Sequence, residues 1–507
     1  MILKNSIIKK LGFFTLFILI QSVISFQGNS EYFSEEENNP IEELYFKVNS
    51  TYMKEVISDI MDLLDSYVFY DILQNPPEPY TKLKVDLKKE FENIDISEEK
   101  SFYEFYREIK KIIPRSADSA FDILGNELIV EQKIIPFQNY RLCLPFKFYL
   151  DYKKNDSVKM YIKEYSECVG YYDNNIKEFI KNHENISLDE INGKDAFDFI
   201  QALGSEFYQF KNKNSFFNYI MDTISDFYLK YIPILPEEIN SMNLLFNDNE
   251  TLDTSFYLIK SKDNETLNKS NVKEINWTYQ TTNGELKCRF DEKYNLNVLF
   301  LNSFNIDEDD IQTIFNCARL FFANKYEIVV IGKQILEGEN LYSYILTQIL
   351  QPKIDFKLNF AMRQSELNRL NFESKIEQFL DVETCRPFKS WNDFIQSDPD
   401  KYDDIEHKRT KIYNPISKSW LMQLNEIRKE FKSNGMLKKP TEILILTDTL
   451  SFGSGSTFIK NIQINGAAIT ASYAGNPFNE ETNLDASLDP CEVTKYEGTD
   501  IISISIY

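Results

Sequence analysis

Short apolar runs alternate with longer amphipathic segments in the C-terminal half of the chain. The runs NVLFL (297–301), EIVVI (327–331) and TEILIL (441–446) lack polar alternation, and each predicts a short buried strand. Between the first two runs, residues 307–325 repeat apolar positions at a three-and-four spacing, which predicts a helix with one core-facing stripe. This order is typical of an α/β fold whose mostly parallel sheet is covered on both faces.

The N-terminal half has a different pattern. Residues 43–124 are predominantly helical in their apolar spacing, whereas residues 126–285 mix short β-like runs with helices. Residues 275–290 predict a hairpin, with Asn283-Gly284 as its turn. The predicted organisation has four parts. These are a signal peptide (1–25), an acidic leader with a helical region (26–125), a mixed α+β region (126–290) and an α/β domain (291–507).

The first 25 residues have the features of a secretory signal peptide. Lys4, Lys9 and Lys10 precede a short apolar run at 11–23, and small residues stand before an expected cut near Ser25. An uncleaved membrane anchor is the alternative, but the run is shorter than the roughly 20 residues that a spanning helix needs. We therefore expect a secreted protein with no stable membrane span after cleavage.

Glycosylation acceptors and cysteines fit an exported chain. The six cysteines lie beyond the signal peptide, and Cys143 with Cys168 is the favoured disulfide. For Cys317, on the apolar face of the predicted helix, a buried free thiol is an equally good expectation. The N-x-Ser/Thr acceptors are Asn49, Asn155, Asn185, Asn249, Asn264, Asn268 and Asn276.

Charge and composition exclude several classes of function. The chain of 507 residues carries a formal net charge of −23, which opposes binding to nucleic acids, and its 43% hydrophobic content is that of a globular protein. No Cys/His cluster has the spacing of zinc ligands, and the acidic run 307–310 is better explained as a helix start. We expect neither a metal nor a cofactor.

Residues 441–461, TEILILTDTLSFGSGSTFIKN, run from a strand through a Ser/Gly-rich turn into a helix. Together with SFYEFYREIKKI, LKCRFDEKYNLNVLFLNSF, TFIKNIQINGAAI and YAGNP, this stretch resembles the tail-specific (S41) serine peptidases, in particular their secreted eukaryotic branch. The resemblance implies a crotonase-like (ClpP/crotonase) fold for the C-terminal domain. It also implies a serine-type peptidase (hydrolase) acting in proteolysis, with a peptide or protein ligand in its cleft.

The residues that would carry the family's chemistry are altered in this chain. A gapless match places Gly453 at the position of the nucleophilic serine, and Ser454 is the neighbouring alternative. For the oxyanion site the chain offers Gly332, Gly338, Gly453 and Gly455, with the bulky run 335–337 where small residues are expected. Lys460 is the candidate base. His183 and His407, the two histidines, are interpreted as surface residues outside the matching motifs.

Three hypotheses follow from these changes. In the first, the chain is a pseudopeptidase that binds a peptide or protein in the former cleft without cleaving it. In the second, it is an active serine endopeptidase that uses Ser454. In the third, it is a surface glycoprotein whose cleft is filled. The sequence specifies neither the ligand nor the oligomeric state.

Overall fold

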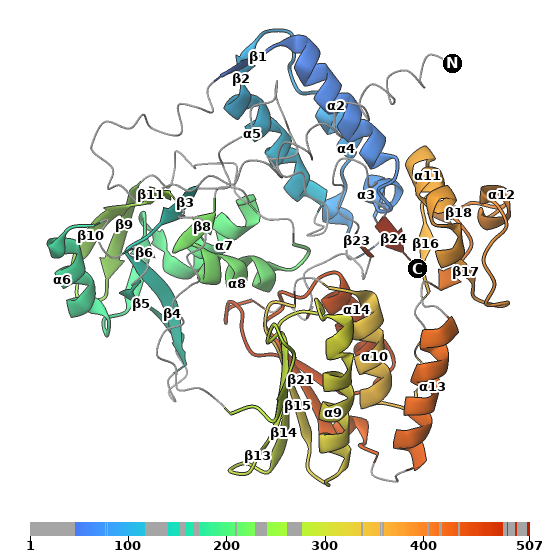
Figure 1. Ribbon diagram of the computed structural model, residues 1–507. Helices are drawn as coiled ribbons and strands as arrows, with labels where there is room; N and C mark the ends of the chain where they lie inside the picture. The colour runs from blue at the N-terminus through green and yellow to red at the C-terminus, as the bar shows by residue number, and fades with distance from the viewer. Residues whose placement is uncertain are drawn as a thin grey trace, which may run out of the picture.

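The structure, a computed structural model, describes most of the chain after residue 45 (Figure 1). The predicted signal peptide lies outside the described residues, and no described helix is long and apolar enough to span a membrane. The described residues are 46–76, 78, 80–116, 140–152, 158–165, 168, 172–207, 210–228, 241–260, 276–335, 338–354, 356, 359–402, 405–414, 418–433, 437–479, 484, 492–493 and 504–506.

The C-terminal half contains a sheet with the strand order β12-β13-β14-β15-β21-β22. β14, β15, β21 and β22 are parallel, whereas β12 and β13 form an antiparallel hairpin at one edge, joined by a turn in which Gly284 has φ +74°. The strands are β12 (Tyr279–Gln280), β13 (Leu286–Asp291), β14 (Leu296–Leu301), β15 (Ile328–Gly332), β21 (Ile443–Thr447) and β22 (Ile469–Ser472). The predicted mostly parallel sheet and its hairpin are confirmed.

Helices pack against one face of this sheet (Figure 1). They are the 3₁₀ turn η8 (Glu308–Asp310), α9 (Ile311–Phe322), α10 (Asn340–Leu350), α13 (Lys418–Ser433) and α14 (Ser454–Ile464). The predicted stripe in α9 is Ile311, Ile314, Phe315, Ala318 and Phe322. The last four are buried, and Ile311 is half-buried against the same core. These side chains share one core with the inward residues of the strands, including Leu299, Val330 and Ile445.

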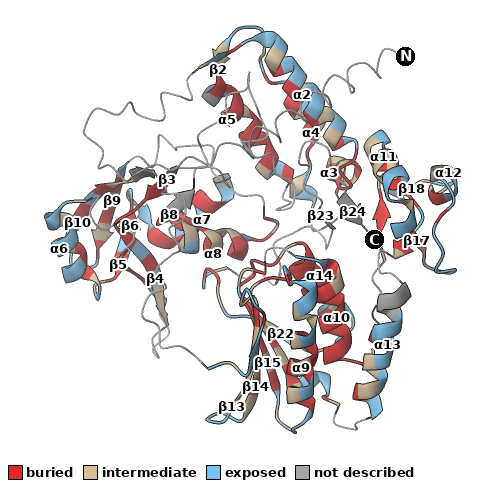
Figure 2. Cartoon of the chain, viewed as in Figure 1, coloured by how far each residue is buried: buried red, intermediate tan, exposed pale blue. Residues whose placement is uncertain are grey.

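Among the described residues helices cover only one face of the sheet, contrary to the expectation that both faces are covered. In β14, β15 and β21 buried residues alternate with half-buried ones, and the half-buried side chains are not part of the core that the helices cover (Figure 2). These side chains are Val298, Phe300, Val329, Ile331, Leu444 and Leu446. Because they are as apolar as the buried row, the sequence pattern could not distinguish one covered face from two.

A subdomain lies between α10 and α13. It consists of α11 (Glu366–Ser374), η9 (Ile376–Gln378), α12 (Trp391–Phe394) and the short strands β16 (Ala361–Met362), β17 (Leu380–Asp381), β18 (Asp400–Tyr402), β19 (Ile405–His407) and β20 (Tyr413–Asn414). β16 also pairs with β24 (Ile504–Ile506), which pairs with β23 (Glu492–Val493). Stacked aromatic rings, including Phe372 on Phe394 at 4.8 Å, fill its interior.

The N-terminal region is helical, as predicted. Its elements are β1 (Lys47–Val48), α2 (Ser50–Leu64), α3 (Tyr70–Gln74), η2 (Thr81–Leu83), α4 (Leu87–Glu92), β2 (Lys100–Ser101), α5 (Phe102–Ile112) and η3 (Ile113–Ser116). Side chains cap these helices where the sequence supplies acceptors. Asn49 accepts the N–H of Tyr52, and Ser101 forms a capping box with Glu104 at the start of α5.

The middle region combines an antiparallel sheet of order β10-β9-β6-β5-β4 with three helices. Its strands are β4 (Phe146–Tyr152), β5 (Val158–Glu164), β6 (Leu188–Ile191), β7 (Lys194–Asp195), β9 (Ser241–Phe246) and β10 (Thr251–Ser255). A second sheet contains β3 (Tyr140–Cys143), β8 (Asp226–Tyr228) and β11 (Tyr257–Lys260). The helices are α6 (Asn174–His183), α7 (Ala196–Phe207) and α8 (Lys213–Thr223).

The predicted division into domains stays a prediction, but packing and strand pairing cross two of its boundaries. One hydrophobic core extends from Val48 in the helical region to Leu252 in the middle region, so these two parts form a single body. The expected boundary between residues 290 and 291 falls within β13, which pairs with β14 along its whole length. The C-terminal sheet therefore begins at β12, because the hairpin supplies the antiparallel edge of the parallel sheet.

Two disulfides connect elements of the described chain. Cys143 is bonded to Cys168, the favoured pair, and Cys288 on β13 is bonded to Cys317 on α9. The expectation of a free thiol at Cys317 is therefore wrong. The buried face of α9 lies directly on β13, and this brings Cys317 to Cys288. Cys385 is an exposed free cysteine, and Cys491 lies outside the described residues.

The predicted glycosylation acceptors that the structure describes are all exposed. These are Asn49, Asn185, Asn249 and Asn276. The other three, Asn155, Asn264 and Asn268, lie outside the described residues.

Removal of the Cys288–Cys317 disulfide is expected to destabilise the C-terminal body. The two cysteines are separated by 29 residues, and closing a loop of that length contributes about 3–4 kcal/mol through the entropy of the unfolded chain. The double variant Cys288→Ala, Cys317→Ala should therefore lower Tm by roughly 6–15 °C in calorimetry. Cys385→Ala is the control and should leave Tm unchanged; an unchanged Tm in the double variant would contradict the disulfide.

Candidate functional site

The turn between β21 and α14 has the geometry of a strained strand-to-helix elbow. Gly453 directly precedes α14 with φ 55° and ψ −126°, a conformation that residues with side chains rarely adopt. A Cβ atom built on Gly453 would meet no heavy atom within 4 Å. A side chain at this position would therefore extend into open space, as a nucleophile at such an elbow must. The chain places a glycine there.

Ser454 does not occupy an equivalent position. It is the first residue of α14 and is only 2% exposed, and its Oγ is buried without a hydrogen-bond partner. A serine nucleophile needs access to substrate and a base within hydrogen-bond distance. Lys460, half-buried and six residues further along α14, does not hydrogen-bond to the Ser454 hydroxyl. Ser451 and Ser456 are fully buried.

A second turn, after β15, lies against the first. The carbonyl oxygen of Ile335 accepts the backbone N–H of Phe452 at 3.2 Å. A Cβ on Gly455 would lie 2.3 Å from that same carbonyl oxygen, so only glycine permits this contact. Ile335 is fully buried and also covers Gly332. The expectation that Ile335 crowds this turn is confirmed.

Gly338 makes a close backbone contact in this turn. It has φ +119° and pairs with Phe304, whose backbone would collide with a Cβ at this position. Leu336 and Glu337, which were also expected to crowd the turn, lie outside the described residues.

Asp448 joins the two turns. Its side chain accepts the N–H of Gln334 at 2.8 Å and the N–H of Leu450 at 3.0 Å. Burial of this carboxyl, which is 4% exposed, raises its pKa to about 6, although the two N–H donors act in the opposite direction. The N–H of Gln334 is thus already bonded to a carboxylate. It follows that this turn does not present that N–H to an oxyanion.

Helix α8 of the middle region closes over the same turn. The Nδ2 group of Asn218 donates to the carbonyl of Asp448 at 2.5 Å and to Thr449 Oγ1 at 3.1 Å. The hydroxyl of Ser215 donates to the carbonyl of Thr449 at 2.7 Å. Because Asn218 and Ser215 are buried, these bonds fix the turn from the side opposite to β21. Sequence analysis did not identify either residue, since Asn and Ser within a helix give no signal of a contact some 230 residues away.

An aromatic cluster continues this contact. Leu450 and Phe452 of the turn pack with Phe210, Phe216 and Tyr219 beside and on α8. The loop after β22 adds hydrogen bonds, because the Asn214 side chain accepts the N–H of Asn476 at 3.1 Å. The elements on both sides of the turn are therefore bound to each other by apolar and polar contacts.

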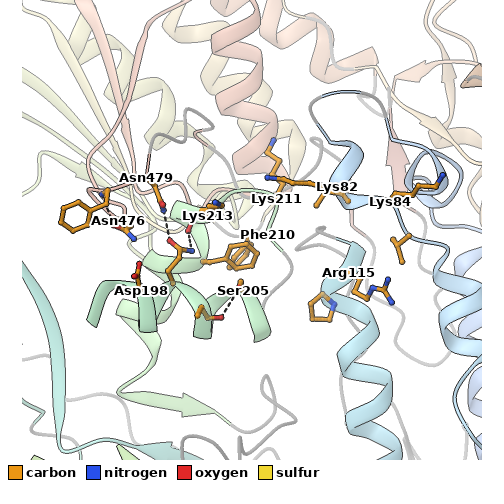
Figure 3. Close-up of a pocket in the computed structure, with 17 residues that line it drawn as sticks. Lys82, Lys84, Arg115, Asp198, Ser205, Phe210, Lys211, Lys213, Asn476 and Asn479 are labelled. Carbon is orange, nitrogen blue, oxygen red and sulfur yellow. Dashed lines mark hydrogen bonds between the residues drawn. The ribbon is translucent and has the colours of Figure 1, made fainter. Parts of the chain in front are cut away.

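A cavity of about 710 Å³ opens beside the aromatic cluster. Phe210, Phe216 and Phe478 supply apolar wall, and Asp198 is the one acidic residue among those that line it. Cationic residues line it at and just before the start of α8 and in the helical N-terminal region (Figure 3). They are Lys82, Lys84, Arg115, Lys211 and Lys213. Arg115 also pairs with Glu90. The cavity is thus a basic surface in a strongly acidic chain.

The two histidines are buried, contrary to the expectation of surface residues. His407 is 6% exposed, and its Nδ1 lies 2.9 Å from Asp71 Oδ2, where Arg363 also binds. His183 is 4% exposed at the end of α6. The error arose because both residues are flanked by charged residues in the sequence and gave no apolar signal. The Nδ1 of His183 lies 2.8 Å from the carbonyl oxygen of Phe179.

Substitution of the two glycines should separate the open position from the crowded one. Gly453→Ser is expected to cost about 1–3 kcal/mol, which is backbone strain alone. Gly455→Ala should cost more, about 3 kcal/mol or above, since its methyl group would displace Ile335. Urea denaturation would measure both, and equal costs would contradict the described packing of the two turns.

The raised pKa of Asp448 predicts a specific dependence of stability on pH. Its ordinary value is 3.8 and its folded value about 6, so between these values the folded state keeps a proton that the unfolded chain has lost. Its contribution to stability is full below pH 4 and falls by about 3 kcal/mol as pH rises to 6. The difference in unfolding free energy between the wild type and Asp448→Asn should therefore be larger at pH 4 than at pH 7. A constant difference would show that Asp448 ionises normally.

Comparisons with known proteins give structural likeness only. No protein-family model matches the chain, and no curated protein matches it. Among solved structures, it is similar to mature CPAF (11% identity, TM-score 0.47, covering 90% of this chain and 88% of that chain). The same values hold for mature CPAF complexed with lactacystin, with 89% of that chain covered. The photosystem II D1 C-terminal processing protease is also similar (8% identity, TM-score 0.31, 90% and 86% covered).

Proposed function

We propose that the chain is a secreted, glycosylated homologue of the tail-specific (S41) serine peptidases that binds a peptide or protein segment without cleaving it. The observation that carries this proposal is the residue at the elbow. Gly453 has the strained backbone and the open surroundings that suit a nucleophile, but it has no side chain. The neighbouring hydroxyl of Ser454 is buried without a partner.

The arrangement of the two turns supports a crotonase-like C-terminal domain. They follow β21 and β15, which are adjacent parallel strands, so both lie at the same edge of the sheet. Ligands of α/β sheets bind at this edge. The resemblance implies that the first turn supplies the nucleophile and the second supplies oxyanion donors. In this chain Ile335 and Asp448 occupy the contacts that such donors need.

The expected losses of rate acceleration favour a binding role over slow catalysis. Enzymes of this chemistry that lose the nucleophile retain about 10³–10⁴-fold acceleration over water. Loss of an oxyanion donor removes roughly another 10²–10³-fold. With both changes, little acceleration would remain. Binding contacts away from the reacting bond are unaffected by these losses, so ligand recognition can persist.

The basic cavity indicates the chemistry of the ligand. Five cationic side chains surround a partly aromatic wall, whereas the chain as a whole carries a net charge of −23. Such a surface complements a peptide segment with carboxylates, including a free C-terminal carboxylate, and apolar side chains. We assign an acidic peptide segment to this cavity as the ligand of the proposed binding protein.

Activity-based labelling together with peptide binding tests this function. The wild-type protein should show no labelling by a fluorophosphonate probe, because no accessible serine lies at the elbow. It should nevertheless bind a fluorescent acidic peptide with a free carboxyl terminus, as measured by anisotropy. Labelling that disappears in Ser454→Ala, accompanied by peptide cleavage, would establish the active endopeptidase instead. Absence of both labelling and binding would favour a filled cleft.

Charge reversal of cavity residues tests whether the acidic peptide binds in the cavity. The double variant Lys82→Glu, Lys84→Glu should weaken peptide binding by about tenfold, because two attractive contacts become repulsive. The double variant Lys47→Glu, Lys54→Glu changes two exposed positions that are not among the cavity's lining residues; it is the control for net charge and should bind normally.

A further inference from the structure

His183 is held with one ring nitrogen fixed and the other unpartnered. It ends α6 and stacks on Phe179 with ring centroids 3.8 Å apart, and it also packs against Phe246. Its Nδ1 lies 2.8 Å from the carbonyl oxygen of Phe179. Since a carbonyl only accepts, Nδ1 carries the hydrogen, and in the neutral ring the lone pair is on Nε2.

Two carboxylates face this Nε2 atom from the turn between β9 and β10. Asp248 Oδ2 lies 3.4 Å from it and Glu250 Oε2 lies 3.2 Å from it. Neither oxygen has the geometry of a hydrogen bond to Nε2, which is buried and without a hydrogen-bond partner. The His183 side chain is 6% exposed, whereas the carboxylates are accessible from solvent. A buried nitrogen lone pair therefore lies beside two accessible anionic groups.

The distances match those between ligands of one metal ion. Zinc–nitrogen and zinc–oxygen bonds are about 2.1 Å, so two ligand atoms at a tetrahedral angle lie about 3.4 Å apart. Both nitrogen–oxygen distances here are close to that value. All three ligand atoms lie within 4.8 Å of one another. One ion could contact all three with small side-chain adjustments, leaving a fourth position open to solvent.

The surrounding contacts orient these groups as in metal sites. The Nδ1–H bond to a backbone carbonyl is the usual support of a histidine ligand. In the turn, Asp248 Oδ1 accepts the N–H of Glu250 at 3.1 Å, which leaves Oδ2 directed to the imidazole. Asn249 between them has φ +68°, and the carboxylates of both its neighbours reach His183 at the end of α6.

We propose that His183, Asp248 and Glu250 form a binding site for a divalent transition-metal ion of the zinc type. One imidazole with two carboxylates suits Zn²⁺ or a similar borderline ion, whereas Ca²⁺ takes six to eight oxygen ligands. The bound ion links the end of α6 to the β9–β10 turn. This site is independent of the peptide-binding cavity, since none of its three residues lines that cavity.

The test is calorimetric titration of Zn²⁺ into protein that has been treated with a chelator. The wild type should bind one Zn²⁺ with micromolar or tighter affinity, and its Tm should rise with Zn²⁺ but not with Ca²⁺. His183→Gln should weaken this binding at least 100-fold. The double variant Asp248→Asn, Glu250→Gln should do the same. Because its two positions are accessible, it remains informative if the buried histidine variant fails to fold.

Asp253→Asn provides the matched control. Asp253 is an exposed carboxylate of β10, in the same hairpin, and it contacts Asn243 instead of His183. Zn²⁺ affinity should be unchanged in this variant. Absence of saturable Zn²⁺ binding, or binding that persists in the double variant, would overturn the proposal and leave only a direct contact between His183 and the two carboxylates.

Discussion

The contact between Ile335 and Gly455 determines the geometry of the candidate site. It brings together two turns that follow adjacent parallel strands, and it is possible only because position 455 lacks a side chain. The Ile335 carbonyl takes the N–H of Phe452. Helix α14 therefore starts with Ser454 facing inward. Gly453 is left at the strained, open position of the elbow. In this described turn the side chains of Ser451, Ser454 and Ser456 are all buried.

The docking of α8 has a comparable influence on the whole molecule. The chain has one core in its N-terminal and middle parts and another in its C-terminal part. The buried hydrogen bonds of Ser215 and Asn218 connect the two at the elbow. Each such bond contributes only about 1 kcal/mol net, but leaving a buried partner unsatisfied costs more. The interface therefore favours one arrangement, in which the carbonyl groups of Asp448 and Thr449 are occupied by protein.

Much of the C-terminal fold could be predicted from sequence because its signals are local. Apolar runs, the spacing within α9 and the Asn283-Gly284 turn each identify an element without reference to the remainder of the chain. One-sided burial of the sheet could not be predicted, because Val329 and Ile331 are as apolar as Val330. The predicted boundary at residue 290 falls within β13 for a related reason. Strand pairing decides which sheet a hairpin joins, and pairing is not local.

For the candidate site, too, the sequence predicted local features but not contacts between distant parts of the chain. The crowding by Ile335 and the glycine at position 453 were evident from a matched motif. The docking of α8, the raised pKa of Asp448 and the grouping of His183 with Asp248 and Glu250 were not. Each joins residues from distant parts of the chain, and single asparagine, serine or histidine residues carry no sequence signal of their future neighbours.

A crystal structure that resolves residues 447–456 at about 2 Å would test the central claim most directly. It should show Gly453 near φ 55° and ψ −126° with its Cα facing open space. It should also show the Ser454 hydroxyl turned into the protein, and the Asn218 amide on the Asp448 carbonyl. An elbow formed by Ser454, with its hydroxyl facing a cleft and bonded to a base, would contradict the account.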